Sequence, residues 1–187
     1  MATQLLLIRH GESLLGSQGR YAGHADTPLT PKGRDQVFCL RRRFIRFRVA
    51  RVYSSDLERC RETARILSPD GEIISTRQLR ELDFGMWDGR TSDEILRRSP
   101  VRYRRWLADP QTVTPSRGES LFHLARRVRR FVREIIQQRD PGNIAIVTHG
   151  GPIRTLLLSD LKDFWSIEVP PASMTVRTWD VVRGMAS

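Results

Sequence analysis

The stretch LLLIRHGES, residues 5–13, decides how the rest of the chain is interpreted. Its apolar part, residues 5–8, ends at Arg9 and His10, and a glycine follows. A short apolar run bounded by polar residues and glycine is typical of a buried strand. In open α/β sheets, ligands bind beyond the carboxyl ends of the strands. We therefore predict that Arg9 and His10 lie at the mouth of a sheet and face a negatively charged group.

Apolar runs and amphipathic segments alternate along the rest of the chain. Further strands are predicted at residues 50–55, 72–76, 143–148 and 174–182. Helices are predicted at residues 31–47, 56–67, 91–139 and 152–158, the third of them broken at 109–118. Strands that alternate with helices predict an α/β fold whose largely parallel sheet is covered on both faces. No internal repeat or linker is evident, so we expect one domain over residues 1–187.

The net charge of +11 raises the question of a polyanionic partner. Lys32 and Lys162 are the only lysines, and the arginines cluster at residues 41–48 and 126–133. In both clusters the arginines alternate with apolar residues at helical spacing, which places them on the outer faces of amphipathic helices. We interpret them as solvated helix faces. Nucleic acid is not favoured as a partner, while small anionic substrates would be attracted.

The composition predicts a cytoplasmic globular protein without a membrane segment. Hydrophobic residues make up 39% of the chain, and no apolar stretch approaches the roughly 18 residues of a membrane span. The first strand begins almost at the N-terminus, so no signal peptide is expected. Cys39 and Cys60 do not have the spacing of a metal motif, and we expect no cofactor. A homodimer is one assembly that the sequence leaves open.

A second strand repeats the opening pattern. The run at 143–148 ends at His149, which glycine follows, and the run at 50–55 leads to a helix start that contains Arg59. Carboxyl ends of parallel strands meet at one edge of a sheet, so these side chains are expected to converge with Arg9 and His10. Arginine forks and helix N-termini both bind phosphate oxygens. The sequence therefore predicts a pocket for phosphate or a comparable oxyanion.

Each of these residues could also have an ordinary structural role. His10 and His149 could each be a loop histidine that hydrogen-bonds the backbone, and Arg59 could be a surface charge. A zinc site formed by His10, Glu12 and His149 is a further alternative. Flanking arginines would repel a cation, and the spacing is not that of a usual metal motif. We therefore expect no metal.

A phosphate pocket with a nucleophile also needs a group that protonates the leaving oxygen, and a carboxylic acid can do so. Glu81 lies in LRELDFGMWDG, residues 79–89, before a glycine and a tryptophan. It could equally pair with a neighbouring arginine. Spacing alone does not choose Glu81 over Glu12, Asp56 or Asp83.

Five blocks together resemble the histidine phosphatase superfamily, also called the phosphoglycerate mutase-like family. In chain order they are RHGES (9–13), GRYAGHADTPLTPKG (19–33), VYSSDLERCRETA (52–64), LRELDFGMWDG (79–89) and VTHGG (147–151). The resemblance implies a three-layer α/β/α sandwich and hydrolysis through a phosphorylated histidine without a metal. The roles that it implies are nucleophile for His10, proton donor for Glu81, phosphate binding for Arg9, Arg59 and His149, and substrate contact for Ala22 and Gly23.

The sequence departs from the family pattern at Gly16, where many relatives have an asparagine that helps to hold the phosphoryl group. The segment PSRGESL, residues 115–121, resembles bacterial phosphatases that act on α-ribazole 5'-phosphate in cobalamin synthesis. Ser116 and Glu119 also have the spacing of a helix capping box. We predict a phosphomonoester hydrolase of small phosphorylated metabolites. The alternatives are a phosphoglycerate mutase and a non-catalytic anion-binding module.

Overall fold

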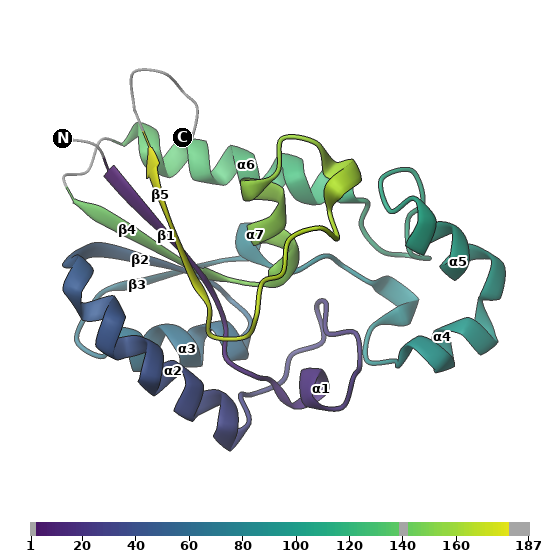
Figure 1. Cartoon of the computed structure of the whole chain (residues 1–187), viewed down its shortest axis with the longest axis horizontal. Coiled ribbons are helices and arrows are strands. Elements are labelled where there is room, and N and C mark those ends of the chain that lie inside the picture. The colour runs from purple at the N-terminus through teal and green to yellow at the C-terminus, as the bar shows by residue number, and fades with distance from the viewer. Residues whose placement is uncertain (1–2, 139–141, 180–187) are drawn as a thin grey trace.

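The computed structural model describes residues 3–138 and 142–179, which are built around one five-stranded sheet (Figure 1). Its strands are β1 (Thr3–Arg9), β2 (Val49–Ser55), β3 (Ile73–Thr76), β4 (Asn143–Thr148) and β5 (Met174–Trp179). They are ordered β3-β2-β4-β1-β5; the first four are parallel and β5 pairs antiparallel with β1. The predicted α/β class and largely parallel sheet are confirmed. Residues 180–182 of the last predicted strand lie outside the described residues.

The helices follow the predicted alternation closely. They are α1 (Leu14–Ser17), α2 (Pro31–Phe44), α3 (Glu58–Leu67), α4 (Ser92–Arg98), α5 (Pro100–Ala108), α6 (Leu121–Gln137) and α7 (Gly150–Leu157). Short 3-10 turns are η1 (Ile45–Phe47), η2 (Arg77–Leu79), η3 (Gly85–Trp87) and η4 (Leu161–Asp163). The α2 helix begins where its cap residues predict, because the Thr30 side chain accepts a hydrogen bond from the Gly33 amide and Pro31 occupies the first turn.

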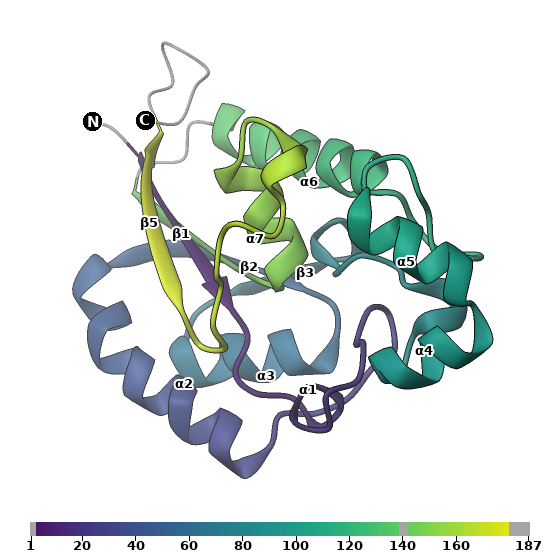
Figure 2. The same ribbon diagram turned by 45° about the vertical axis from the view of Figure 1, so that its right-hand side comes forward.

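The helical region predicted after residue 91 contains a break that the periodicity did not reveal. A second helix, α5, starts at Pro100, and Ser99 between the two helices has φ −144° and ψ 55°. Proline restricts the residue before it away from the helical region and lacks the amide hydrogen that would continue the helix. The chain therefore changes direction between α4 and α5 (Figure 2).

The two faces of the sheet carry separate apolar cores, which gives the three-layer sandwich. Leu5 and Leu7 of β1 contribute to the core beneath α6 and α7, whereas Leu6 and Ile8 contribute to the core beneath α2 and α3. This alternation follows from the period of two along a strand. Both layers of helices are visible on opposite sides of the sheet in Figure 1.

A third apolar cluster lies between α4, α5 and the first half of α6, beyond the end of the sheet toward which β1 points (Figure 1). It is rich in aromatic residues, among them Trp87, Tyr103 and the fully buried Trp106. This cluster supports the segment that carries Glu81, because Leu82 and Phe84 belong to it. Within residues 3–138 and 142–179, no helix has the length and apolarity that crossing a membrane requires.

Candidate active site

His10 and His149 lie side by side at the carboxyl edge of the sheet. The amide of His10 donates to the carbonyl of Thr148, the last residue of β4, at 3.0 Å. The two imidazole rings are consequently neighbours, with centroids 5.1 Å apart and planes at 67°. The convergence predicted from the two strand ends is thus present in the structure, because β4 and β1 pair directly in the sheet.

The hydrogen bonds of His10 define which of its nitrogens carries the proton. Its Nδ1 lies 2.6 Å from the carbonyl oxygen of Gly11, which can only accept, so Nδ1 is protonated. Burial lowers the pKa of His10 well below 6.5, and the charges of Arg59 and Arg9 lower it further. His10 is therefore a neutral imidazole whose Nε2 carries a lone pair. In the described part of the chain no group hydrogen-bonds to that Nε2.

The glycine after His10 is required by packing. A Cβ on Gly11 would lie 2.4 Å from the carbonyl oxygen of Gly33, at the start of α2. The Gly11 amide donates to the side-chain oxygen of Thr63 on α3 at 3.3 Å. The backbone just after β1 is thus packed between α2 and α3. This packing fixes the direction of the chain at His10.

Both ring nitrogens of His149 are engaged by protein groups. Nδ1 accepts a hydrogen bond from Arg59 Nε at 3.2 Å, and the protonated Nε2 lies 2.9 Å from the hydroxyl oxygen of Ser55. Burial, followed by the charge of Arg59, lowers the pKa of His149 well below 6.5. His149 is therefore a neutral ring that holds the side chain of Arg59 in place. Ser55 was not among the residues predicted from sequence.

Arg59 is completely buried and donates most of its hydrogen bonds to one loop. Its Nη1 donates to the carbonyl of Ala25 at 2.9 Å, and its Nη2 to those of Ala22 at 3.1 Å and Gly23 at 2.7 Å. Asp88 holds the same loop, because its carboxylate accepts from the amides of Gly23 and Ala25, both at 2.7 Å. The two predicted substrate contacts, Ala22 and Gly23, thus lie against Arg59 through their backbone.

Arg9 ends β1 with donors that are only partly used. Its Nη1 donates to the carbonyl of Val169, while its Nε is buried and has no hydrogen-bond partner among the described residues. Burial lowers the pKa of Arg9, and the negative charge of Glu81 raises it. A buried N–H without an acceptor costs about 1–3 kcal/mol, a cost that a bound oxyanion would remove.

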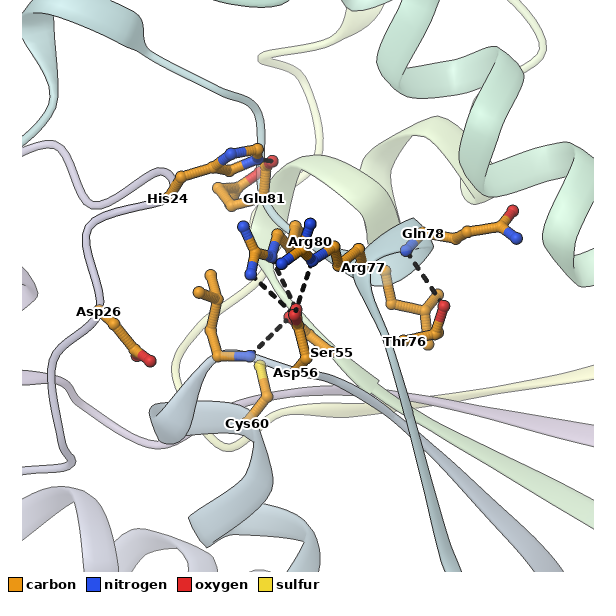
Figure 3. Close-up of polar contacts among 12 residues, drawn as sticks. His24, Asp26, Ser55, Asp56, Cys60, Thr76, Arg77, Gln78, Arg80 and Glu81 are labelled. Atoms are coloured by element: carbon orange, nitrogen blue, oxygen red, sulfur yellow. Dashed lines mark hydrogen bonds and ion pairs between the residues drawn. The ribbon is translucent and has the colours of Figure 1, made fainter.

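Glu81 lies at the first turn of α7. Both oxygens of its carboxylate accept from the amide of Gly151, each at 3.1 Å, and Oε1 accepts from the amide of Leu82 at 2.9 Å. Its carbonyl accepts from Arg127 Nη2 at 2.8 Å and lies 3.2 Å from His24 Nε2. The last contact is visible in Figure 3. Side chain and backbone of Glu81 are therefore both fixed, with the carboxylate held at the start of the helix that follows His149.

The other carboxylates that the sequence left open as acids have different partners. Asp56 forms a two-point ion pair with Arg80, with both N–O distances 2.7 Å (Figure 3). Glu12 accepts from Lys32 at 3.0 Å. Asp83 accepts from the amide of Gly85 at 2.8 Å. The Asp56–Arg80 pair joins the residue before Glu81 to the segment that leads into α3.

A zinc site is not assembled around these histidines. Across residues 3–138 and 142–179, no three His, Cys, Asp or Glu side chains form a group that could hold a metal ion. Glu12, the third member of the zinc alternative, is directed to Lys32 and to the hydroxyl of Thr30, which donates to it at 2.9 Å.

Arg154 is a further cation at this edge that sequence reasoning missed. It lies in the second turn of α7, and the negative charge of Glu81 raises its pKa against a larger lowering by burial. The available signal was its position five residues after His149 on a helix that starts at the strand exit. Among so many arginines, that spacing did not distinguish it.

Comparison with known proteins gives a match to one family. The model of the histidine phosphatase superfamily (branch 1) matches residues 5–184. Phosphoserine phosphatase 1 of Hydrogenobacter thermophilus is 34% identical over 179 residues, which cover 92% of this chain and 85% of that protein. The adenosylcobalamin/alpha-ribazole phosphatase of Salmonella typhimurium is 34% identical over 173 residues, covering 91% and 83%.

A similar solved structure is that of YhfR from Bacillus stearothermophilus. It superposes with a TM-score of 0.93 at 32% sequence identity, over 100% of this chain and 95% of that one. The agreement extends over all three layers of the sandwich, so the fold class predicted from sequence is confirmed by comparison as well.

Proposed function

The chain belongs to the histidine phosphatase superfamily, and from this premise we propose that it hydrolyses phosphate monoesters through a phosphohistidine on His10. Its relatives are named as phosphatases of small phosphorylated metabolites, and the chain is a phosphatase of this kind. A mutase is not favoured by these relatives. The proposal adds the residues that carry out the reaction and their order of action.

The observation that carries the proposal is the protonation state of His10. An imidazole attacks phosphorus through an unprotonated nitrogen, and Gly11 holds the proton on Nδ1 while Nε2 is left with its lone pair. The lowered pKa keeps the ring neutral at pH 7. A histidine that served only as a structural residue would gain from a partner for Nε2, and none is present within the described ranges.

In the first step, Nε2 of His10 attacks phosphorus in line with the ester oxygen. The phosphorus–oxygen bond to the alcohol breaks, and Glu81 gives its proton to the leaving oxygen. Arg9 and Arg59 stabilise the charge on the equatorial oxygens. His149 supports Arg59 through its Nδ1, and we assign the substrate contact to Ala22 and Gly23, whose carbonyls accept hydrogen bonds from Arg59.

In the second step, water attacks the phosphorus of the phosphohistidine. Glu81 accepts the proton of that water, the bond between phosphorus and Nε2 breaks, and inorganic phosphate leaves. Glu81 thereby returns to its protonated state and His10 to its neutral state. Splitting one displacement into two steps is the usual advantage of covalent catalysis.

For the substrate we propose small phosphorylated metabolites, with α-ribazole 5'-phosphate and phosphoserine as the first compounds to test. The names of the two relatives described above motivate both compounds. The proposal also covers a single catalytic domain over residues 1–187 and action in the cytoplasm. Oligomeric state stays a prediction.

The test is a panel of phosphorylated metabolites incubated with the purified protein and followed by phosphorus NMR. We expect release of inorganic phosphate, with the highest kcat/KM among nucleoside-like monoesters for α-ribazole 5'-phosphate. With 3-phosphoglycerate we expect little 2-phosphoglycerate. Efficient interconversion of the two phosphoglycerates would contradict the hydrolase, whereas a different best substrate would contradict only the ribazole assignment.

A further inference from the structure

The proposed phosphate pocket has fewer free hydrogen-bond donors than its charge suggests. Both ring nitrogens of His149 are engaged, and Arg59 donates through Nε to His149 and through both Nη atoms to backbone carbonyls. A transferring phosphoryl group needs donors to its three equatorial oxygens. Arg59 has five N–H donors, of which four are used by the protein, so a further donor to these oxygens besides Arg9 is expected.

The guanidinium groups of Arg154 and Arg9 both lie close to Gly150, the first residue of α7. A Cβ placed on Gly150 would be 3.0 Å from Nη1 of Arg154 and 3.8 Å from Cζ of Arg9. The two guanidinium groups therefore approach the same point, next to the residue that follows His149. Gly150 leaves this space open, because a Cβ there would press on Arg154, while its contact with Arg9 would be an ordinary one.

The Arg154 guanidinium is held firmly, yet its terminal donors are free. Its Nε donates to the carbonyl of Ile167 at 2.9 Å, and its Cζ lies 5.5 Å from the ring centre of Phe164 and 5.7 Å from that of Trp165. No acceptor for its Nη groups is found in the part of the chain that the structure describes. A side chain fixed in this way is preorganised for binding an anion.

The charges at this point agree with a phosphate dianion. The formal charges that act on Arg9 are those of Glu81, Arg154 and Arg59. Three guanidinium groups and two neutral histidines leave an excess of positive charge here, whether Glu81 is ionised or carries the proton that the first step needs. A phosphate monoester dianion would offset most of that excess.

Arg127, another arginine that acts on His149, is already neutralised. It forms a two-point ion pair with Glu119, and both N–O distances are 2.8 Å. It therefore leaves the charge balance of the pocket unchanged.

We propose that Arg154 is a third phosphate-binding arginine, which donates from its Nη groups to a non-bridging oxygen of the substrate phosphoryl group. This inference rests on the proposed function, because it needs a phosphoryl group at His10. It assigns Arg154 to the phosphoryl group, which all substrates share, and not to the leaving group.

The test compares Arg154→Gln and Arg154→Lys with Arg129→Lys. Arg129 is a matched control, because it is also a partly buried arginine that donates to carbonyls of α7 and its C-terminal end, those of Thr155 and Leu158. The readouts are competitive inhibition by inorganic phosphate and the kcat/KM values of two substrates, p-nitrophenyl phosphate and phosphoserine.

We expect the inhibition constant of phosphate to rise about 10- to 100-fold in Arg154→Gln, and kcat/KM to fall by a similar factor for both substrates. Arg154→Lys, which keeps the charge and the stem, is expected to lie between Arg154→Gln and the wild type; it replaces Arg154→Gln as the test if that variant does not fold. Arg129→Lys is expected to match the wild type.

An unchanged inhibition constant, or a loss confined to phosphoserine, would overturn the inference and place Arg154 against the leaving group. A wild-type protein that hydrolyses neither substrate would instead contradict the proposed function.

Discussion

The amide N–H of Gly151 lies 3.1 Å from both carboxylate oxygens of Glu81, although 70 residues separate the two in sequence. The proposed proton donor is therefore positioned by the backbone at the start of α7, the helix that directly follows His149. No side chain has to be ordered to hold it. This contact ties the geometry of the acid to the strand that carries the second histidine.

Gly151→Ala is predicted to displace the proposed acid. A Cβ at this position would lie 2.1 Å from Oε1 of Glu81, so the carboxylate must move. We expect kcat for phosphoserine to fall at least about tenfold, because general acids lose efficiency when they are misplaced. Steady-state kinetics measure the loss. In a Glu81→Gln background the same change is expected to cause little further loss, and additive effects would show that Gly151 does not act through Glu81.

Glu81→Gln is predicted to lower kcat by roughly 10²- to 10⁴-fold for substrates with poor leaving groups. An aryl phosphate needs little protonation of its leaving oxygen, so formation of the phosphohistidine from p-nitrophenyl phosphate is expected to suffer less. Rapid-quench measurement of the first turnover separates that step from hydrolysis of the intermediate. Equal losses for both substrates in this step would move the acid role to Glu12, Asp56 or Asp83.

His10→Ala is predicted to abolish turnover while the fold is kept. The lone pair on Nε2 is then lost, and the variant cannot form the covalent intermediate. In the wild type, a quench without acid after brief incubation is expected to trap phosphate on His10, which peptide mass spectrometry detects. Activity above a few per cent of the wild-type kcat in the variant would exclude His10 as nucleophile.

Acid is predicted to destabilise the fold through the two buried histidines. The pKa values of His10 and His149 lie well below 6.5 in the folded chain, whereas histidines in the unfolded chain have a pKa of about 6.5. As pH falls below that value, the unfolded chain takes up protons first. The free energy of unfolding then falls by up to about 1.4 kcal/mol per pH unit for each histidine, and the effect vanishes above about pH 7.5.

Urea denaturation at pH 7.5 and 5.5 measures this dependence. His10→Asn is expected to reduce the difference between the two pH values, while His123→Gln, at an exposed position on α6, is expected to leave it unchanged. A wild-type stability that is equal at both pH values would show that the two imidazoles are not kept neutral by burial.

Much of this architecture follows from the sequence alone. Residues 5–8 and 144–147 are apolar, and each run leads within two residues to a histidine followed by glycine; this pattern predicts both the strands and the edge at which they end. The reason is physical: side chains at the carboxyl ends of neighbouring parallel strands must share one edge. Thr30 and Pro31 likewise predict the start of α2, because capping depends on adjacent residues only. Ser99 and Pro100 carried the signal for the break between α4 and α5, although the periodicity concealed it.

The tertiary structure decided which groups touch. Glu81, Asp56, Glu12 and Asp83 were equivalent in sequence, and only packing shows that Glu81 alone among them meets the α7 backbone while the others have different partners. The free Nε2 of His10 and the position of Arg154 beside Arg9 were likewise evident only from the tertiary structure. These features depend on distances between segments far apart in the chain. Periodicity and local propensity report only which face a residue occupies, so such contacts are set when the layers pack together.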